Sequence, residues 1–255
     1  MKINGKTFVA TGGASGFGEV SIRRFHALGA NVVICDLNRE RGEALEKELG
    51  EKSLFVKTDV ASEAEVTALF EEAVKKFGKV HILLNCAGIA PPKRILGKEG
   101  PLPLDAFKKV IDINLVGTFN VLSKAAWVMS KNEPGEDEER GVIINTASAA
   151  AYEGQIGQAA YSASKGGIVS LTLTAARDLA RNAVRVCSIA PSTFKTPMAD
   201  TLSAEVIESL SKQIPFPQRL GNPEEFAGLV QFLVENGYMN GTTIRIDGAV
   251  RMGPR

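Results

Sequence analysis

Features that would direct a chain to a membrane, a metal ion or a nucleic acid are scarce in this sequence of 255 residues. No run of about 18 or more apolar residues occurs, so no segment is predicted to cross a membrane as a helix. The formal net charge is only +1, and it gives no electrostatic footprint for nucleic acid or an anionic membrane surface. With two histidines and no Cys-x-x-Cys spacing, we expect no metal site.

Cysteine is also scarce. Cys35, Cys86 and Cys187 are odd in number, far apart and set in apolar runs. This pattern predicts buried thiols in a reducing compartment rather than a disulfide framework. The strand-like segment Thr7–Thr11 begins so early in the sequence that we expect no cleaved targeting segment before it. Together these points predict a protein of the cytoplasm or of an organelle matrix.

What the sequence does contain is a series of short apolar runs separated by longer amphipathic stretches. The runs are rich in Val, Ile and Leu, as in strands that are covered on both faces. They are Thr7–Thr11, Asn31–Cys35, Leu54–Val56, Ile82–Asn85, Gly141–Thr146, Val184–Ala190 and Thr242–Ile246. Helical spacing of apolar residues between runs, as in Glu63–Phe77, indicates α/β alternation. We predict a Rossmann-like, doubly wound, seven-stranded parallel sheet with helices on both faces.

No composition break or linker divides the chain, so residues 1–255 are predicted to form a single domain. Two segments resemble insertions between elements. Pro91–Pro103 is rich in proline, glycine and lysine, and Ser130–Arg140 is acidic. Both are predicted to be surface loops, because a charge run is usually solvated.

A glycine-rich turn, Thr11 to Gly18, follows the first strand and leads into a helix near Glu19. Glycines let the backbone approach a pyrophosphate, and the helix N-terminus offers free N–H groups to the anion. Such a turn can also be a plain connection. Asp36 at the end of the second strand favours dinucleotide binding. A carboxylate there accepts hydrogen bonds from the ribose and repels a 2′-phosphate, so NAD is predicted over NADP, although Arg39 lies nearby.

Tyr161 and Lys165 stand four residues apart, a spacing that places them on one face of a helix. A cation beside a phenol lowers the pKa of the phenol, which makes Tyr161 a candidate acid/base. Ser148 follows the strand ending at Thr146, at the edge where open parallel sheets bind ligands. Taken alone, the Tyr/Lys pair could be surface packing and the serine a turn former. No Gly-x-Ser-x-Gly motif surrounds Ser148, so it is not predicted to be a nucleophile.

Together the glycine turn, Asn85-Cys86-Ala87-Gly88, Asn114, Ser148 and Tyr161-x-x-x-Lys165 resemble the short-chain dehydrogenase/reductase family over essentially the whole chain. The resemblance implies that Ser148 orients the substrate oxygen and that Tyr161 is the acid/base. It implies that Lys165 binds the nicotinamide ribose and tunes Tyr161, and that Asn114 supports a proton relay through water. The cofactor contacts that it implies are Gly12, Ser15, Gly16, Phe17, Gly18, Asp36, Asp59, Val60, Asn85, Ala87, Gly88, Tyr161, Lys165, Pro191 and Thr196.

One branch of the family is most similar. The stretch Glu153–Tyr161 and the tail Asp247–Met252 resemble enzymes that act on 3-hydroxyacyl-CoA. The resemblance implies NAD-dependent, reversible oxidation of (3S)-3-hydroxyacyl-CoA to 3-oxoacyl-CoA, a homotetramer, and the mitochondrial matrix as an alternative location to the cytoplasm. Small residues at Ala149–Ala151 are expected to leave room for the acyl chain, and Lys93, Arg94 and Lys98 are candidates to meet the CoA phosphates.

The sequence departs from the family pattern at Ser192 and His81, among other positions, and it leaves two rival functions open. Ser192 follows Pro191 where glycine is usual, and His81 stands where aspartate is common and is interpreted as structural. One rival is a 3-oxoacyl-carrier-protein reductase or another alcohol or steroid dehydrogenase of the family. The other is a non-catalytic binding protein on the same fold.

Overall fold

Seven parallel strands form one sheet in the order β3-β2-β1-β4-β5-β6-β7. The computed structural model describes residues 1–196 and 203–254. The strands are β1 (Thr7–Thr11), β2 (Asn31–Asp36), β3 (Ser53–Lys57), β4 (Ile82–Asn85), β5 (Gly141–Thr146), β6 (Val184–Pro191) and β7 (Thr243–Ile246). The predicted bounds of β1, β4 and β5 agree with the structure, and the other strands differ by one residue at one or both ends. The doubly wound α/β prediction is confirmed.

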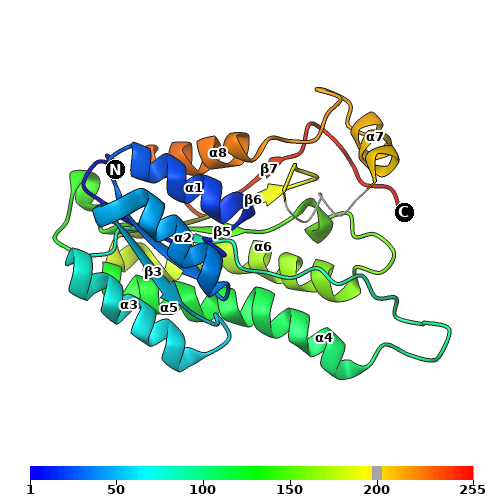
Figure 1. Cartoon of the computed structure of the whole chain (residues 1–255), viewed down its shortest axis with the longest axis horizontal. Coiled ribbons are helices and arrows are strands. Elements are labelled where there is room, and N and C mark those ends of the chain that lie inside the picture. The colour runs from blue at the N-terminus through cyan, green and yellow to red at the C-terminus, as the bar shows by residue number, and fades with distance from the viewer. Residues whose placement is uncertain (197–202, 255) are drawn as a thin grey trace.

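Helices cover both faces of the sheet (Figure 1). On one face lie α1 (Gly16–Ala27), α2 (Arg39–Leu49) and α8 (Pro223–Glu235), and on the other lie α3 (Glu63–Phe77), α5 (Gly117–Met129) and α6 (Ala159–Leu179). The helix α4 (Leu104–Ile111) runs into α5 through a π-helical turn over Asp112–Val116, and α7 (Ala204–Lys212) lies near the C-terminal tail. No helix of the described residues is long and apolar enough to cross a membrane.

Alternation along the strands divides the core into two layers. Phe8 packs against α1 and α8, whereas its neighbour Val9 packs against α3 and α5. Val32 and Val33 of β2 separate in the same way. Successive strand residues point to opposite faces, so a strand covered on both sides needs apolar residues throughout. This is why these runs lack polar alternation.

The order of the strands reverses at β1, which pairs with both β2 and β4. The chain moves outward from β1 to β3 and then returns to build β4 to β7 on the other side. In open parallel sheets, ligands bind in the crevice outside the carboxyl ends of the strands at this switch point. The glycine turn after β1 and the segment after β4 therefore lie at the expected binding edge.

The two predicted insertions differ from each other. Residues 91–103 form an exposed arm beside α4 with a single bridge between Leu96 and Pro101 (Figure 1). The segment 130–140 is only partly a surface loop, because Asn132 is buried and donates to the carbonyl oxygens of Val80 and Arg140 at 2.7 and 2.8 Å. Glu139 also forms a largely buried ion pair with Arg185 at 2.7 Å. The acidic run thus contains a structural charge.

Two further expectations, free cysteine thiols and a structural role for His81, agree with the structure. All three cysteines are free thiols, two of them buried and Cys86 half-buried. His81 accepts the backbone N–H of Thr7 through Nδ1 at 3.2 Å, and burial lowers its pKa to about 4. A neutral imidazole at the start of the strand is therefore a structural group, as predicted.

Candidate active site

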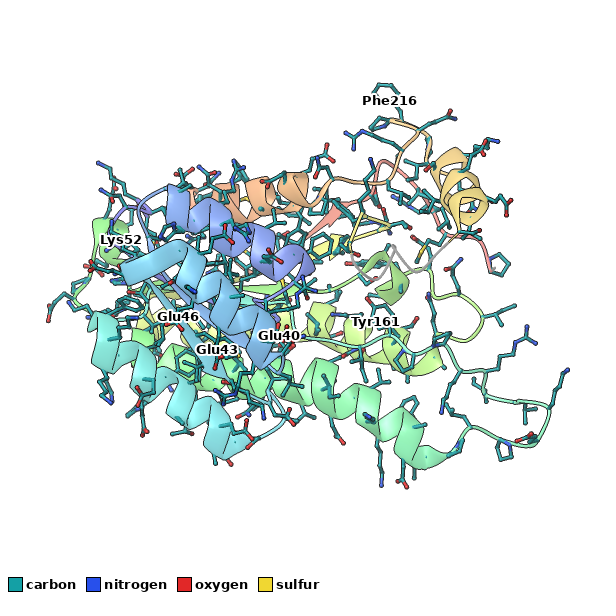
Figure 2. All side chains as sticks on the ribbon, viewed as in Figure 1. Glu40, Glu43, Glu46, Lys52, Tyr161 and Phe216 are labelled. Carbon is teal, nitrogen blue, oxygen red and sulfur yellow. The ribbon has the colours of Figure 1, made fainter. Side chains whose placement is uncertain are left out.

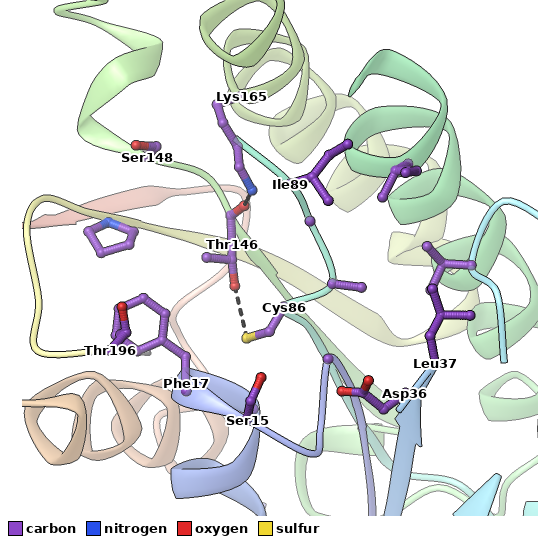
Figure 3. A pocket seen from close by; sticks show the side chains of 18 of the residues that line it. Ser15, Phe17, Asp36, Leu37, Cys86, Ile89, Thr146, Ser148, Lys165 and Thr196 are labelled. Atoms are coloured by element: carbon purple, nitrogen blue, oxygen red, sulfur yellow. Dashed lines mark hydrogen bonds between the residues drawn. The ribbon is translucent and has the colours of Figure 1, made fainter. Parts of the chain in front are cut away.

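A cavity of about 610 Å³ runs along the carboxyl ends of the central strands (Figure 3). Most residues that the sequence nominated for the cofactor or for catalysis line this cavity. They are Gly12, Ser15, Gly16, Phe17, Gly18, Asp36, Asp59, Val60, Ala87, Gly88, Ser148, Tyr161, Lys165, Pro191 and Thr196. The glycine turn and Asp36 lie at one end, and Ser148 and Lys165 lie at the other (Figure 3). A long ligand with two functional ends fits this arrangement.

The glycine turn is shaped for close approach of a ligand. Gly12 has φ of +62°, and a Cβ on Gly18 would lie 2.1 Å from the carbonyl oxygen of Gly12. Only glycine avoids both the left-handed strain and the clash. Ser15 is the N-cap residue of α1, and its side chain accepts no hydrogen bond from the first turn of the helix. The N–H groups at the helix start are therefore not satisfied by this side chain. They fit the pyrophosphate of a dinucleotide.

Asp36 ends β2 beside the turn. Its carboxylate accepts the N–H of Ala14 at 3.0 Å and the N–H of Asn38 at 2.9 Å. These two bonds fix the orientation of the carboxylate at the cavity wall. Arg39, the cation that could have met a phosphate, pairs instead with Glu43 at 2.9 Å. Figure 2 labels acidic side chains of α2, Glu43 among them, and they lie away from Tyr161, the candidate acid/base.

Asn85 does not line the cavity, and its predicted contact with the cofactor stays a prediction. The side chain is buried and donates to Asn145 Oδ1 at 2.9 Å. Below the cavity floor, Thr11 Oγ1 accepts the N–H groups of Cys86 and Ala87, each at 3.1 Å. Sequence reasoning missed this role of Thr11, although its place at the last position of β1 was a usable signal. The two polar residues support the floor from beneath.

Lys165 is buried and extends from α6 to the end of β5. Its Nζ donates to the carbonyl oxygen of Thr146 at 2.6 Å, and the Thr146 hydroxyl lies 3.2 Å from Cys86 Sγ (Figure 3). Burial lowers the pKa of Lys165 to about 8. The ammonium group is therefore placed at the cavity with one protein acceptor and with further donor capacity toward a ligand.

Tyr161 corrects one expectation. Burial raises the pKa of Tyr161 above its usual value, and a hydrogen bond from Ser148 partly opposes the shift. Lys165 Nζ lies 5.7 Å from the Tyr161 ring centroid and does not lower the pKa as the i,i+4 spacing predicted. The reason is that burial disfavours the charged form of both groups. The phenol of the ligand-free protein is protonated, and it can donate that proton to a substrate oxygen.

Asn114 lies in the π-helical turn and is fully buried. Its Oδ1 accepts the N–H of Ile89 at 2.8 Å, and its Nδ2 donates to the Ile89 carbonyl at 2.9 Å and to Ser164 Oγ at 3.1 Å. Both amide hydrogens are thus used within the protein. The side chain ties the segment after β4 to α6, and the predicted proton relay through water remains a prediction.

Ser148 starts a short 3₁₀ turn over Ala149–Ala151, and its hydroxyl oxygen accepts the N–H of Ala150 at 3.1 Å. Ala149 and Ala150 are buried, and none of the three alanines lines the cavity. The expectation that they leave room for an acyl chain stays a prediction. Ser192 and Phe194, which sequence reasoning did not place in the site, also line the cavity, and the ring centroid of Phe194 lies 5.1 Å from that of Phe17 in the glycine turn.

The doubly wound sheet, the dinucleotide cavity and the Ser148, Tyr161 and Lys165 groups at one end define a nicotinamide-dependent oxidoreductase. In the described residues, no group of three or more His, Cys, Asp or Glu side chains could hold a metal ion. The family model described as "Enoyl-(Acyl carrier protein) reductase" matches residues 12–250. The chain belongs to the short-chain dehydrogenase/reductase family and is an oxidoreductase of secondary alcohols.

The relatives agree with this assignment. The chain is 50% identical to human 3-hydroxyacyl-CoA dehydrogenase type-2 over 99% of this chain and 97% of the relative. A crystal structure of 3-hydroxyacyl-CoA dehydrogenase type-2 from Mycobacterium avium matches with a TM-score of 0.95, 45% identity and 98% coverage of each chain. A 3-ketoacyl-(acyl-carrier-protein) reductase from Brucella melitensis, complexed with NADH, matches with a TM-score of 0.87 and 31% identity over 98% of this chain and all of that one.

Proposed function

We propose that this protein is an NAD-dependent dehydrogenase that interconverts 3-hydroxyacyl-CoA and 3-oxoacyl-CoA. The observation that carries the proposal is the convergence of Ser148, Tyr161 and Lys165 at one end of a cavity whose other end is bounded by Asp36. The identity to the type-2 3-hydroxyacyl-CoA dehydrogenases supports the substrate.

The protein residues manage the oxygen and the proton of the substrate. In reduction, Ser148 holds the ketone oxygen while Tyr161 donates its phenolic proton to it, which leaves Tyr161 as the phenolate. In oxidation, the phenolate of Tyr161, formed by loss of its proton to solvent, accepts the proton of the substrate hydroxyl. The nicotinamide, when bound, accepts or supplies the hydride. Lys165 is held at the carbonyl of Thr146, where its remaining donors can bind the ribose of the cofactor.

Asp36 supports NAD over NADP. Its two backbone hydrogen bonds orient the carboxylate at the cavity wall, where a ribose hydroxyl would donate. A 2′-phosphate in the same place would meet a like charge, and such juxtapositions cost several kcal/mol. Arg39 is exposed and paired with Glu43, which further favours NAD.

A second cavity of about 470 Å³ supports an acyl-CoA substrate. It shares Gly88, Ile89 and Lys109 with the cofactor cavity and is otherwise lined mostly by apolar residues and by Lys93. The arm over residues 91–103 also carries the exposed cations Arg94 and Lys98. The apolar wall suits an acyl chain, and the cations suit the CoA phosphates.

The proposal includes a homotetramer. Large apolar side chains are exposed on the outer helices, among them Phe119 and Trp127 on α5, Leu173 on α6 and Phe232 on α8. Phe119 and Trp127 line one groove together with residues of α6, and contiguous apolar patches mark protein interfaces. A second copy of the chain is the occupant that the family resemblance favours. Sedimentation velocity at micromolar concentration tests this, and a monomer would contradict it. We place the protein in the cytoplasm or the mitochondrial matrix, consistent with its free thiols.

The substrate is tested by mixing purified protein with NADH and acetoacetyl-CoA and following NADH absorbance. We expect substantial turnover with NADH, weaker turnover with steroids and simple alcohols, and an apparent KM that rises with salt, because phosphate attraction is screened. Faster turnover with NADPH and an acyl-carrier-protein thioester would favour the reductase alternative. No oxidation or reduction of any panel member would favour a binding protein.

A further inference from the structure

A cluster of four charged side chains joins the segment after Ser148 to β7 and the C-terminal tail. The four are Glu153, Arg245, Asp247 and Arg251. Arg245 Nη1 and Nη2 donate to the two carboxylate oxygens of Glu153 at 2.6 and 2.8 Å, and Arg245 Nε donates to Asp247 Oδ2 at 2.6 Å. Arg251 Nη1 reaches the same Asp247 oxygen at 3.1 Å. Glu153 and Arg245 lie 92 positions apart in sequence, so the cluster is a tertiary connection.

The connection continues along both segments. Arg245 lies over the ring of Tyr152 at 5.1 Å, and Gln155 Nε2 donates to the carbonyl of Gly253 at 3.1 Å. The N–H of Ile156 donates to the carbonyl of Pro254 at 3.0 Å. Four of the five residues in 152–156 are therefore held by β7 or by the C-terminal tail.

These contacts act on the part of the chain that carries Ser148. The N–H groups of Tyr152 and Glu153 donate to the carbonyl of Ala149 at 2.9 and 3.0 Å, and the Ser148 hydroxyl accepts the next N–H, from Ala150. A shift of Glu153 is thus passed to Ser148 through two consecutive hydrogen-bonded turns. Among the described residues, no hydrogen bond or ion pair joins the glycine turn to this cluster, so we expect the phosphate-binding part of the cavity to be unaffected by it.

The charges suit a stiff joint. Glu153 and Arg245 are about one-fifth exposed and Asp247 is one-tenth exposed, where screening is weaker than at the surface. Arg245 binds Glu153 through both of its terminal guanidinium nitrogens, Nη1 and Nη2. This planar, two-pronged pairing fixes the direction of the two side chains as well as their distance. Two carboxylates balance two guanidinium groups, so the joint carries no net charge.

We propose that Glu153 and Arg245 are positioning residues, which fasten the Ser148 segment to the C-terminal tail and thereby set the place of the Ser148 hydroxyl relative to Tyr161. Neither side chain lines the cavity, so both act through Ser148. The inference rests on the proposed function only in that Ser148 holds the substrate oxygen.

The test uses the variants Glu153→Gln, Arg245→Met and Arg245→Lys in the full-length protein. Misplacement of a reacting group by about 1 Å can cost about 100-fold, so we expect kcat/KM for the ketone substrate to fall by about ten- to 100-fold. The Kd for NADH should change by less than about twofold, a small fraction of the tenfold unit of affinity, because neither side chain lines the cofactor cavity. Arg245→Lys should recover part of the loss of Arg245→Met, because the charge is restored without the fork.

The matched control is Glu48→Gln. Glu48 lies on an exposed surface of α2, and its carboxylate also accepts hydrogen bonds from two nitrogens of one arginine, Arg23, at 2.6 and 2.9 Å. That variant should keep the wild-type kcat/KM. Equal effects of Glu153→Gln and Glu48→Gln would overturn the proposal, and so would a parallel loss of NADH affinity in the Glu153 variant.

A second measurement separates positioning from general destabilisation. In a Ser148→Ala background, Glu153→Gln should cost less than about twofold, because the group through which it acts is already absent. An undiminished loss in that background overturns the proposal. All ratios are taken to wild type on whichever ketone the wild-type enzyme reduces best, so a wrong substrate assignment does not alter the reading.

Discussion

The cofactor side and the substrate side of the cavity are built in different ways. The cofactor side consists of backbone turns at strand ends, such as residues 12–18, and of short-range bonds such as Asp36 to Asn38. The substrate side is assembled from segments after β5, after β6 and from the tail, joined by side chains such as Glu153 and Arg245. The cofactor side therefore depends mainly on backbone groups, whereas the substrate side depends on charged side chains that join distant segments.

The difference teaches where each side is vulnerable. A tight backbone turn is disrupted when a side chain is added to one of its glycines, because the new Cβ collides with a backbone carbonyl oxygen that cannot move aside. A tertiary joint fails when a charge is removed, because the partner charge is left unpaired in a partly buried place. Tyr161 and Lys165 stand where the two sides meet, on α6 and against β5.

The largest expected effect breaks the substrate side alone. Tyr161→Phe should reduce turnover by about 10²–10⁴-fold, because the variant has no proton to transfer. NADH should bind as in wild type, measured by fluorescence titration. Near-normal turnover in Tyr161→Phe would remove Tyr161 from the chemistry.

The meeting point is tested through stability. The pKa of Lys165 falls from 10.5 to about 8 on folding, so below pH 8 both states hold the proton and the folded state bears the cost of a buried charge. Between pH 8 and 10.5 the unfolded state holds a proton that the folded state has released, and stability rises with pH. Relative to Lys165→Met, wild type should gain on the order of 3 kcal/mol across this window. Urea titrations at several pH values measure the difference, and a constant difference would contradict the shift.

On the cofactor side, Gly18→Ala should weaken NADH binding and cost about 1–3 kcal/mol of stability. The added Cβ would lie 2.1 Å from the Gly12 carbonyl oxygen. As the stability control, Gly166→Ala adds a methyl group into open space on α6 and should stabilise the helix slightly. If both variants melted at the wild-type temperature, close packing of the turn would be refuted.

The choice of cofactor sharpens the comparison further. Wild type should prefer NAD over NADP by more than about tenfold in kcat/KM, which is about 1.4 kcal/mol. The double variant Asp36→Ala/Leu37→Arg should narrow or reverse this ratio while acting only on the cofactor side. Equal efficiencies in wild type would show that Asp36 does not select the cofactor.

A further test lies away from both sides of the cavity, at His81. Its pKa is lowered from 6.5 to about 4, so as pH falls from 6.5 toward 4 the unfolded state takes up a proton and stability falls. His81→Asn removes that titration and should flatten the acid side of the stability profile. An unchanged slope between pH 6.5 and 4 would show that His81 does not titrate differently in the two states.

Much of this protein could be predicted from local pattern. The strand runs, the turn at Gly12–Gly18 and Asp36 were readable because each is set by residues close in sequence. Other features could not be predicted in this way. Asn85 lies beneath the cavity, Ala149 and Ala150 are buried, and burial raises the pKa of Tyr161. Each depends on what surrounds the residue in three dimensions.

The sequence by itself determined the order of strands and helices, the glycine turn and the chemical groups of the site. Those features follow from backbone geometry and from periodicity, which act over a few residues. Only the tertiary structure decided which of the nominated residues face the cavity and which groups are desolvated. It also decided that Glu153 meets Arg245, because a contact across 92 positions exists only once β5, β6 and β7 stand side by side.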